Sequence, residues 1–143
     1  MIIVPDASVI LKWVLEKEDE PDYEKAVRLQ QAWLNESIEI RLPTLWRYEV
    51  GNVLGLKKAD MAVELMSALL TYEFDEVPLR TEYGLQVLEH MRDVKQVTFY
   101  DSAYHVLAIR TKGLYLTADA LYVKQAKRKG HVTLLKDWNS PIG

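Results

Sequence analysis

The chain has 143 residues, of which 49% are hydrophobic and 27% charged, and its formal net charge is −3. These proportions are typical of a globular protein, and we expect a single domain over residues 1–143. The chain has no cysteine, which excludes disulfides, thiolate zinc sites and cysteine nucleophiles. No opening apolar run is long enough for a signal peptide or a spanning helix, so we expect a cytoplasmic protein without a membrane partner.

Short apolar strands alternate with helical stretches along the whole chain. The patterns predict strands over residues 2–4, 38–42, 74–79, 114–117 and 132–135. Helices are expected over residues 7–15, 22–34, 44–56, 60–70, 81–91, 98–113 and 119–129. This alternation predicts an α/β protein with three layers, in which helices cover both faces of a mostly parallel sheet. Ligands of such sheets bind beyond the carboxyl ends of the strands, where the topology changes direction.

An acidic residue follows the first strand directly. Asp6 ends the apolar run Ile2-Ile3-Val4 and precedes a predicted helix. It can cap that helix, and Ser8 could do the same, but a side chain at this turn also faces the ligand crevice. Both interpretations stay open for Asp6.

The second acid, Glu49, lies in the apolar arc of the helix that begins after Pro43. Burying a lone carboxylate costs several kcal/mol unless a cationic group pairs with it. Arg41 and Arg47 are possible partners, and a metal ion held by several carboxylates is the alternative. Asn52, at the edge of the same arc, is a candidate supporting residue.

Two further acids open later helices. Asp101 occupies the third position after Thr98, where it can complete a capping box. It shares a helix face with Tyr104, His105 and Ala108, which gives it a partly apolar neighbourhood.

Asp119 follows the strand ending at Thr117 and repeats the pattern of Asp6. Thr117 is placed to orient it or a bound water. His105 is expected to be a packed, hydrogen-bonded histidine, and the three histidines His90, His105 and His131 show no spacing typical of metal ligands.

If these four carboxylates converge, their mutual repulsion requires either protonation or a divalent cation. Two carboxylates about 5 Å apart repel by roughly 3 kcal/mol at an effective dielectric constant of about 20. A ligand set made only of oxygen favours Mg²⁺, with Mn²⁺ as a plausible substitute, over zinc. The sequence therefore predicts a metal-dependent hydrolase of phosphate esters, with Asp6, Glu49, Asp101 and Asp119 as catalytic metal ligands.

The same segments resemble the PIN-domain ribonucleases, and in particular the VapC-type toxins of toxin–antitoxin pairs. The resemblance is carried by four segments, Val4-Pro5-Asp6-Ala7-Ser8-Val9-Ile10-Leu11-Lys12-Trp13, Tyr48-Glu49-Val50-Gly51-Asn52-Val53-Leu54, Tyr100-Asp101-Ser102-Ala103-Tyr104 and Leu116-Thr117-Ala118-Asp119. It implies a five-stranded parallel sheet and Mg²⁺-dependent cleavage of RNA by a metal-activated water. It also implies a homodimer and a cognate antitoxin whose C-terminal tail lies near the acids.

Carried over by position, the resemblance gives the acidic cluster just named, with Thr117, Ser8 and Asn52 as supporting polar groups. Pro5 and His105 depart from the pattern, because the family usually has apolar or aliphatic residues at these positions. Neither departure removes a candidate ligand.

The negative net charge does not exclude an RNA partner, because without the four candidate ligands the value of −3 becomes +1. Lys12, Lys57 and Arg110 are candidate contacts to an RNA backbone. Two rival functions stay open. One is a non-catalytic RNA- or protein-binding module with the same fold. The other is an aspartyl-phosphate phosphotransfer domain, although the chain lacks the paired aspartates and a clearly placed lysine that such a site needs.

Overall fold

Five parallel strands form one sheet in the order β3-β2-β1-β4-β5 in the computed structural model, which describes residues 1–141. The α/β fold predicted from the alternation of elements is confirmed, and the sheet is parallel throughout rather than mostly parallel. The strands are β1 (Ile2–Pro5), β2 (Glu39–Pro43), β3 (Asp75–Val77), β4 (Leu114–Thr117) and β5 (Val132–Leu134).

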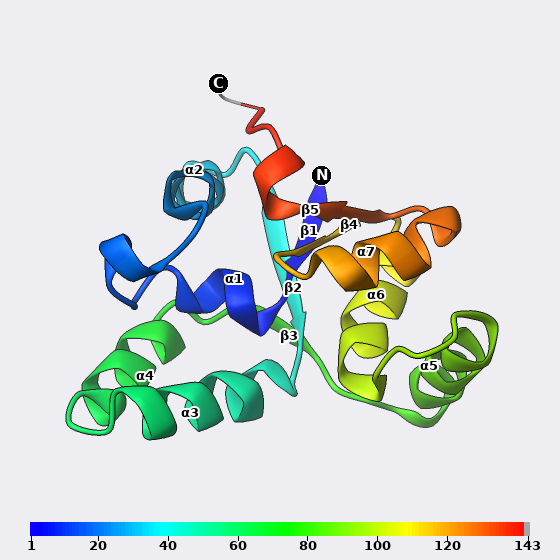
Figure 1. Ribbon diagram of the computed structural model, residues 1–143, viewed down its shortest axis with the longest axis horizontal. Helices are drawn as coiled ribbons and strands as arrows, with labels where there is room; N and C mark the ends of the chain where they lie inside the picture. The colour runs from blue at the N-terminus through cyan, green and yellow to red at the C-terminus, as the bar shows by residue number, and fades with distance from the viewer. Residues whose placement is uncertain (142–143) are drawn as a thin grey trace.

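Helices cover both faces of this sheet, which makes three layers (Figure 1). One group connects β1, β2 and β3 and consists of α1 (Ala7–Leu11), α2 (Tyr23–Leu34), α3 (Trp46–Lys57) and α4 (Ala62–Leu70). The other group precedes β4 and β5 and consists of α5 (Thr81–Asp93), α6 (Phe99–Thr111) and α7 (Ala120–Ala126). None of the helices in the described part of the chain is long and apolar enough to cross a membrane.

The strand order creates a topological switch point between β1 and β4. After β1 the chain proceeds to β2 on one side, whereas after β4 it proceeds to β5 on the other side. Val4 pairs with Tyr115 and Pro5 with Leu116, so the two strands end side by side. Asp6 donates its backbone N–H to the carbonyl of Leu116 over 3.1 Å. Pro5 therefore sits at the strand end, where its missing donor does not interrupt the pairing.

An aromatic cluster packs the layer made by α1 to α4 against the sheet. The Trp33 ring stacks on Phe74 with centroids 5.0 Å apart, and Trp46 meets Phe74 edge-on at 5.1 Å. Trp13 packs on Trp33 at 6.1 Å and donates its indole N–H to the carbonyl of Ala26 over 2.8 Å. These contacts join the segment after α1 to α2, α3 and the start of β3, and so fix the helices that flank the switch point.

The predicted elements all occur, but several boundaries differ. The first helix was expected to reach residue 15, yet α1 ends at Leu11 and the chain continues in turns, with the N–H of Trp13 bonded to the carbonyl of Ile10. The last long helix is also shorter than expected, because α7 ends at Ala126 and a 3₁₀ turn, Lys127–Lys129, follows it. The strand predicted over residues 74–79 is reduced to Asp75–Val77.

Gly113, between α6 and β4, allows the backbone to approach β1 closely. A Cβ at this position would lie 2.5 Å from the carbonyl oxygen of Ile2 and 3.1 Å from its Cβ. We expect Gly113→Ala to lower the free energy of unfolding by about 1–3 kcal/mol, because backbone must move to relieve the overlap. Gly51→Ala is the matched control, since a Cβ there meets nothing within 4 Å and alanine favours a helix. Urea denaturation of both variants tests this, and an equal stability of Gly113→Ala and the parent would contradict it.

Candidate active site

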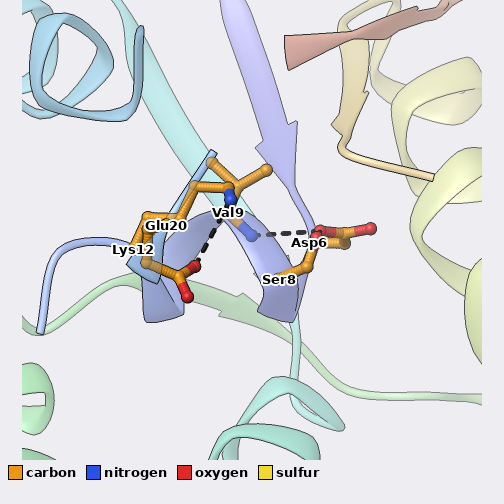
Figure 2. Close-up of polar contacts among 5 residues, drawn as sticks. All are labelled: Asp6, Ser8, Val9, Lys12 and Glu20. Atoms are coloured by element: carbon orange, nitrogen blue, oxygen red, sulfur yellow. Dashed lines mark hydrogen bonds and ion pairs between the residues drawn. The ribbon is translucent and has the colours of Figure 1, made fainter. Parts of the chain in front are cut away.

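Asp6 is held at the end of β1 by donors from two elements. It caps α1, with its Oδ1 accepting from the backbone N–H of Val9 over 3.2 Å and from the Ser8 hydroxyl over 2.5 Å. Figure 2 shows these residues at the start of α1, with Asp6 pointing away from the Lys12–Glu20 pair at the other end of the helix. The capping interpretation of Asp6 is therefore confirmed.

The second oxygen of Asp6 is bound from the neighbouring strand. Thr117 donates its hydroxyl to Oδ2 over 2.6 Å, and Tyr115 donates its hydroxyl to the same atom over 3.1 Å. Both residues belong to β4 and point to the same side of the sheet, because they are two positions apart on one strand. The carboxylate is 7% exposed and has a fixed orientation at the switch point.

Glu49 approaches the same region from α3. Its Oε1 accepts a hydrogen bond of 2.7 Å from the hydroxyl of Tyr104 on α6, so a single contact connects the helices on opposite faces of the sheet. The arginines considered as its partners are engaged elsewhere. Arg47 pairs with Glu76 at 2.8 Å and Arg41 with Asp75 at 3.2 Å.

Asp101 lies in the first turn of α6, and Asp119 is the N-cap residue of α7. The hydroxyl of Thr98 caps α6 by accepting from the Asp101 backbone N–H over 3.1 Å. Asp119 caps α7, its Oδ1 accepting from the backbone N–H of Tyr122 over 3.0 Å. The Thr117 hydroxyl, which donates to Asp6, also accepts from the Asp119 N–H over 3.1 Å. Thr117 thus connects the carboxylate of Asp6, after β1, with the backbone of Asp119, after β4.

One pocket of about 180 Å³ collects the four acids. Its lining consists of Asp6, Ala7, Ser8, Glu49, Asp101 and Asp119. The ion pairs found within residues 1–141 do not include any of these carboxylates. The pocket is therefore a concentration of negative charge without a basic side chain to neutralise it.

Three of the acids in this pocket have raised pKa values, and burial is the main cause in each. Burial raises the pKa of Asp6, despite the opposing effect of its hydrogen bonds from Ser8 and Thr117. Burial also raises the pKa of Asp101 to about 6, and the charges of Asp6 and Asp119 act in the same direction. The pKa of Glu49 is raised by burial as well, with further contributions from Asp6 and Asp101.

The chemistry of these donors fits a divalent cation, while their arrangement is not yet that of a coordination shell. All are carboxylate oxygens, the ligands that Mg²⁺ and Mn²⁺ prefer, and a bound cation would favour the ionised form that burial disfavours in Asp6, Glu49 and Asp101. Within residues 1–141, however, no three histidine, aspartate or glutamate side chains are arranged as the ligands of one metal ion. Asp6, Glu49, Asp101 and Asp119 are the side chains of this pocket that could hold such a cation.

Some predicted residues lie elsewhere. Asn52 is exposed on α3 and does not line the pocket. Lys12, a candidate RNA contact, is 4% exposed and pairs with Glu20 at 3.3 Å, so it does not face the solvent. Arg110 contacts Glu82, Gln86 and the Tyr83 ring on α5. Of the three candidate RNA contacts, only Lys57 has an exposed side chain without an ion pair among the described residues.

The tyrosine hydroxyls are the functional groups that sequence reasoning missed. Tyr115 supports Asp6 and Tyr104 supports Glu49, and burial raises the pKa of both phenols, so they remain donors. The alternation in Leu114-Tyr115-Leu116-Thr117 was a usable signal, since Tyr115 and Thr117 share the strand face next to Asp6. The contact between Tyr104 and Glu49 joins residues 55 positions apart and left no signal in the sequence.

This fold and this pocket define a three-layer α/β protein with an acidic site at the carboxyl ends of its central strands. The chain matches the family model of the PIN domain over residues 3–137, and it belongs to this family. PIN domains are generally nucleases, which supports a hydrolase that acts on nucleic acid. A comparison with curated proteins gives no match.

Proposed function

We propose that this protein is a Mg²⁺-dependent endoribonuclease and the toxin of a VapBC-type toxin–antitoxin pair in the cytoplasm. The observation that carries the proposal is the pocket itself, where acids from four separate segments meet without a cationic side chain. A structural role does not explain all of them, because Glu49 caps no helix and has no ion pair with an arginine among residues 1–141. The PIN family membership supports the same type of chemistry.

In this proposal Asp6, Asp101 and Asp119 hold the cation, and Glu49 binds it directly or through water. A bound divalent cation supplies Lewis-acid activation of water and neutralises the charge of a phosphodiester. The chain supplies the orientation. Asp6 is restricted to one rotamer by hydrogen bonds from Thr117, Ser8 and Tyr115. One carboxylate oxygen of Glu49 is held by a hydrogen bond from Tyr104. A ligand that is already fixed, as Asp6 is, loses less entropy when the cation binds.

The same proposal includes protein partners, a second copy of the chain and an antitoxin. Large apolar side chains are exposed on α3 and α4, with Tyr48 at 80%, Leu56 at 78% and Val63 at 76%. An apolar groove of about 350 Å³ lies between these helices and is lined by Gly51, Leu54, Ala62, Val63, Met66 and Ser67. Exposed apolar surface of this kind suits protein contacts, and it supports both partners without distinguishing them.

Cleavage of single-stranded RNA tests the enzymatic part. We expect endonucleolytic products with Mg²⁺ or Mn²⁺, no products after chelation with EDTA, and recovery when the cation is restored in excess. Products with 5′-phosphate ends would agree with attack by water on phosphorus. Cleavage that continues at the same rate in EDTA would contradict the proposal, and the control for contaminating nucleases is Asp6→Asn purified in parallel.

A second candidate is a non-catalytic RNA- or protein-binding module of the same fold. The observation that favours it is the lack of a ready coordination shell within residues 1–141. Such a module would bind RNA with equal affinity in EDTA and in Mg²⁺ and would leave it intact. The aspartyl-phosphate alternative requires a lysine beside the phosphate, and Lys12 is paired with Glu20 outside the pocket. Labelling of the protein by beryllofluoride would support the aspartyl-phosphate alternative.

A further inference from the structure

Three buried side chains on different helices form a chain of hydrogen bonds behind the acidic pocket. The hydroxyl of Tyr122 on α7 lies 2.9 Å from Nε2 of His90 on α5 and 2.7 Å from Nδ1 of His105 on α6. The other ring nitrogen of His105, Nε2, lies 2.7 Å from the carbonyl oxygen of Gly130, just before β5. Figure 1 shows α5, α6 and α7 together on one face of the sheet.

The direction of every bond in this chain follows from the carbonyl at its end. A carbonyl only accepts, so His105 must carry a proton on Nε2. When His105 is neutral, its Nδ1 accepts the single hydroxyl proton of Tyr122. The Tyr122 oxygen then accepts from His90, which must carry its proton on Nε2. One arrangement of protons thus accounts for all three hydrogen bonds.

Burial keeps both histidines in the neutral form that this arrangement needs. His90 is 4% and His105 0% exposed. Burial lowers the pKa of each ring to about 4, and the neighbouring charge of Lys129 acts in the same direction on both. Asp93, which opposes the shift of His90, is itself bound to Lys129 at 3.0 Å. At neutral pH both histidines are therefore neutral, and all three hydrogen bonds form in the directions given above.

Tyr122 connects this chain to the acidic pocket. Its backbone N–H donates to Oδ1 of Asp119, the residue that caps α7. α7 has seven residues and buries only Tyr122 and Ala126, and a helix this short has little stability of its own. The position of α7 therefore depends on its tertiary contacts, which include the buried hydrogen bonds of the Tyr122 hydroxyl to His90 and His105.

We propose that His90, Tyr122 and His105 act together as positioning residues that hold Asp119 at the acidic pocket. The two histidines fix the Tyr122 hydroxyl, the hydroxyl fixes the first turn of α7, and the first turn places the Asp119 carboxylate. The consequence for metal binding rests on the proposed function, whereas the placement of Asp119 does not.

Three variants of the full chain separate this role from packing. His105→Phe keeps a ring and removes both polar contacts, and Tyr122→Phe removes the hydroxyl alone. His105→Gln retains one donor and one acceptor and serves as the rescue. We expect the first two variants to bind Mn²⁺ roughly 10–100-fold more weakly, as is typical when the support of a metal ligand is lost, and His105→Gln to recover most of the affinity. In an Asp119→Asn background, Tyr122→Phe should have no further effect on Mn²⁺ affinity, because coupled residues are not additive.

Amide hydrogen exchange gives a readout without metal. In Tyr122→Phe and His105→Phe, the amide of residue 122 should exchange at least about tenfold faster relative to the amide of Leu54 in α3, since its bond to Asp119 opens locally. Unchanged relative exchange in both variants would overturn the inference. Parental Mn²⁺ affinity in both variants would overturn it as well. If the parent protein binds no Mn²⁺, the proposed function fails, and the exchange measurement alone decides the positioning role.

Discussion

Asp101→Asn is expected to abolish RNA cleavage and, without divalent cations, to stabilise the fold. Loss of a residue that only supports a metal ligand typically costs 10–100-fold in activity, so loss of a ligand should cost at least about 100-fold. The gain in stability follows from electrostatics. Burial and the charges of Asp6 and Asp119 raise the pKa of Asp101 from 3.8 to about 6, which means that the folded state disfavours its ionised form. Asparagine removes that charge and keeps the shape.

The pH dependence gives this prediction a defined sign. A carboxyl group whose pKa is raised in the folded state contributes stability below pH 3.8, and this contribution is lost as the pH rises through about 6. Asp101→Asn should therefore match the parent near pH 4 and exceed it by about 1–3 kcal/mol above pH 6. Urea denaturation in EDTA at several pH values measures the difference. Asp137→Asn, an exposed acid outside the pocket, makes the same change in charge and should leave both stability and cleavage unchanged. Cleavage by Asp101→Asn at the parental rate would remove this residue from the proposed site.

Mn²⁺ is expected to raise the melting temperature of the parent protein by several degrees. A ligand that binds only the folded state stabilises it by about 2.7 kcal/mol at 100 times its dissociation constant. For a domain of this size each kcal/mol corresponds to roughly 3–4 °C. The cation should bind because it neutralises carboxylates whose pKa values are already raised by burial in Asp6, Glu49 and Asp101, and also by neighbouring acids in Glu49 and Asp101.

The controls for this prediction separate specific binding from screening by salt. Potassium chloride at the same ionic strength should produce a much smaller shift, since the pocket is partly buried and screening is weak there. Asp6→Asn should lose most of the Mn²⁺ effect, because Asp6 is the acid most firmly held in the pocket. An equal shift in the parent and in Asp6→Asn would mean that Mn²⁺ binds elsewhere.

The strand-end acids were predictable from local sequence, because each follows an apolar strand and begins a helix. Predicting that Asp6 and Asp119 lie at the ligand-binding edge required no knowledge of the strand order, since all strands of a parallel sheet end at the same edge. Their adjacency did need it, because only the order β2-β1-β4 places the two ends side by side. Local patterns predicted the five strands, but they do not specify which strands become neighbours.

Helix faces were less predictable than strand ends. Glu49 was placed within the apolar arc of its helix, but the apolar Leu56 on the same helix is 78% exposed, and the buried residues of α3 are Trp46, Val50 and Leu54. A helical pattern shows which residues share a face, but it does not show which of two apolar faces the rest of the protein covers. Glu49 therefore lies at the border of the core, where it reaches both Tyr104 and the pocket.

Lysine and histidine show how burial changes a role that the sequence suggests. Lys12 was interpreted as an RNA contact from its charge, yet it is buried directly after α1 and pairs with Glu20. His105 was correctly expected to be packed and hydrogen-bonded. Its partners, Tyr122 and Gly130, are 17 and 25 residues away in the chain, so the network behind Asp119 became visible only in three dimensions.

The central claim is that the pocket at the ends of β1 and β4 holds a divalent cation, and anomalous diffraction tests it most directly. Crystals of the parent protein soaked in Mn²⁺ should show an anomalous peak within about 2.0–2.4 Å of carboxylate oxygens from Asp6 and at least one of Asp101 and Asp119. The peak should be absent in crystals of Asp6→Asn prepared in the same way. A parent crystal with no peak in this pocket at saturating Mn²⁺, or with a lysine or arginine head group bound among the four acids, would contradict the account.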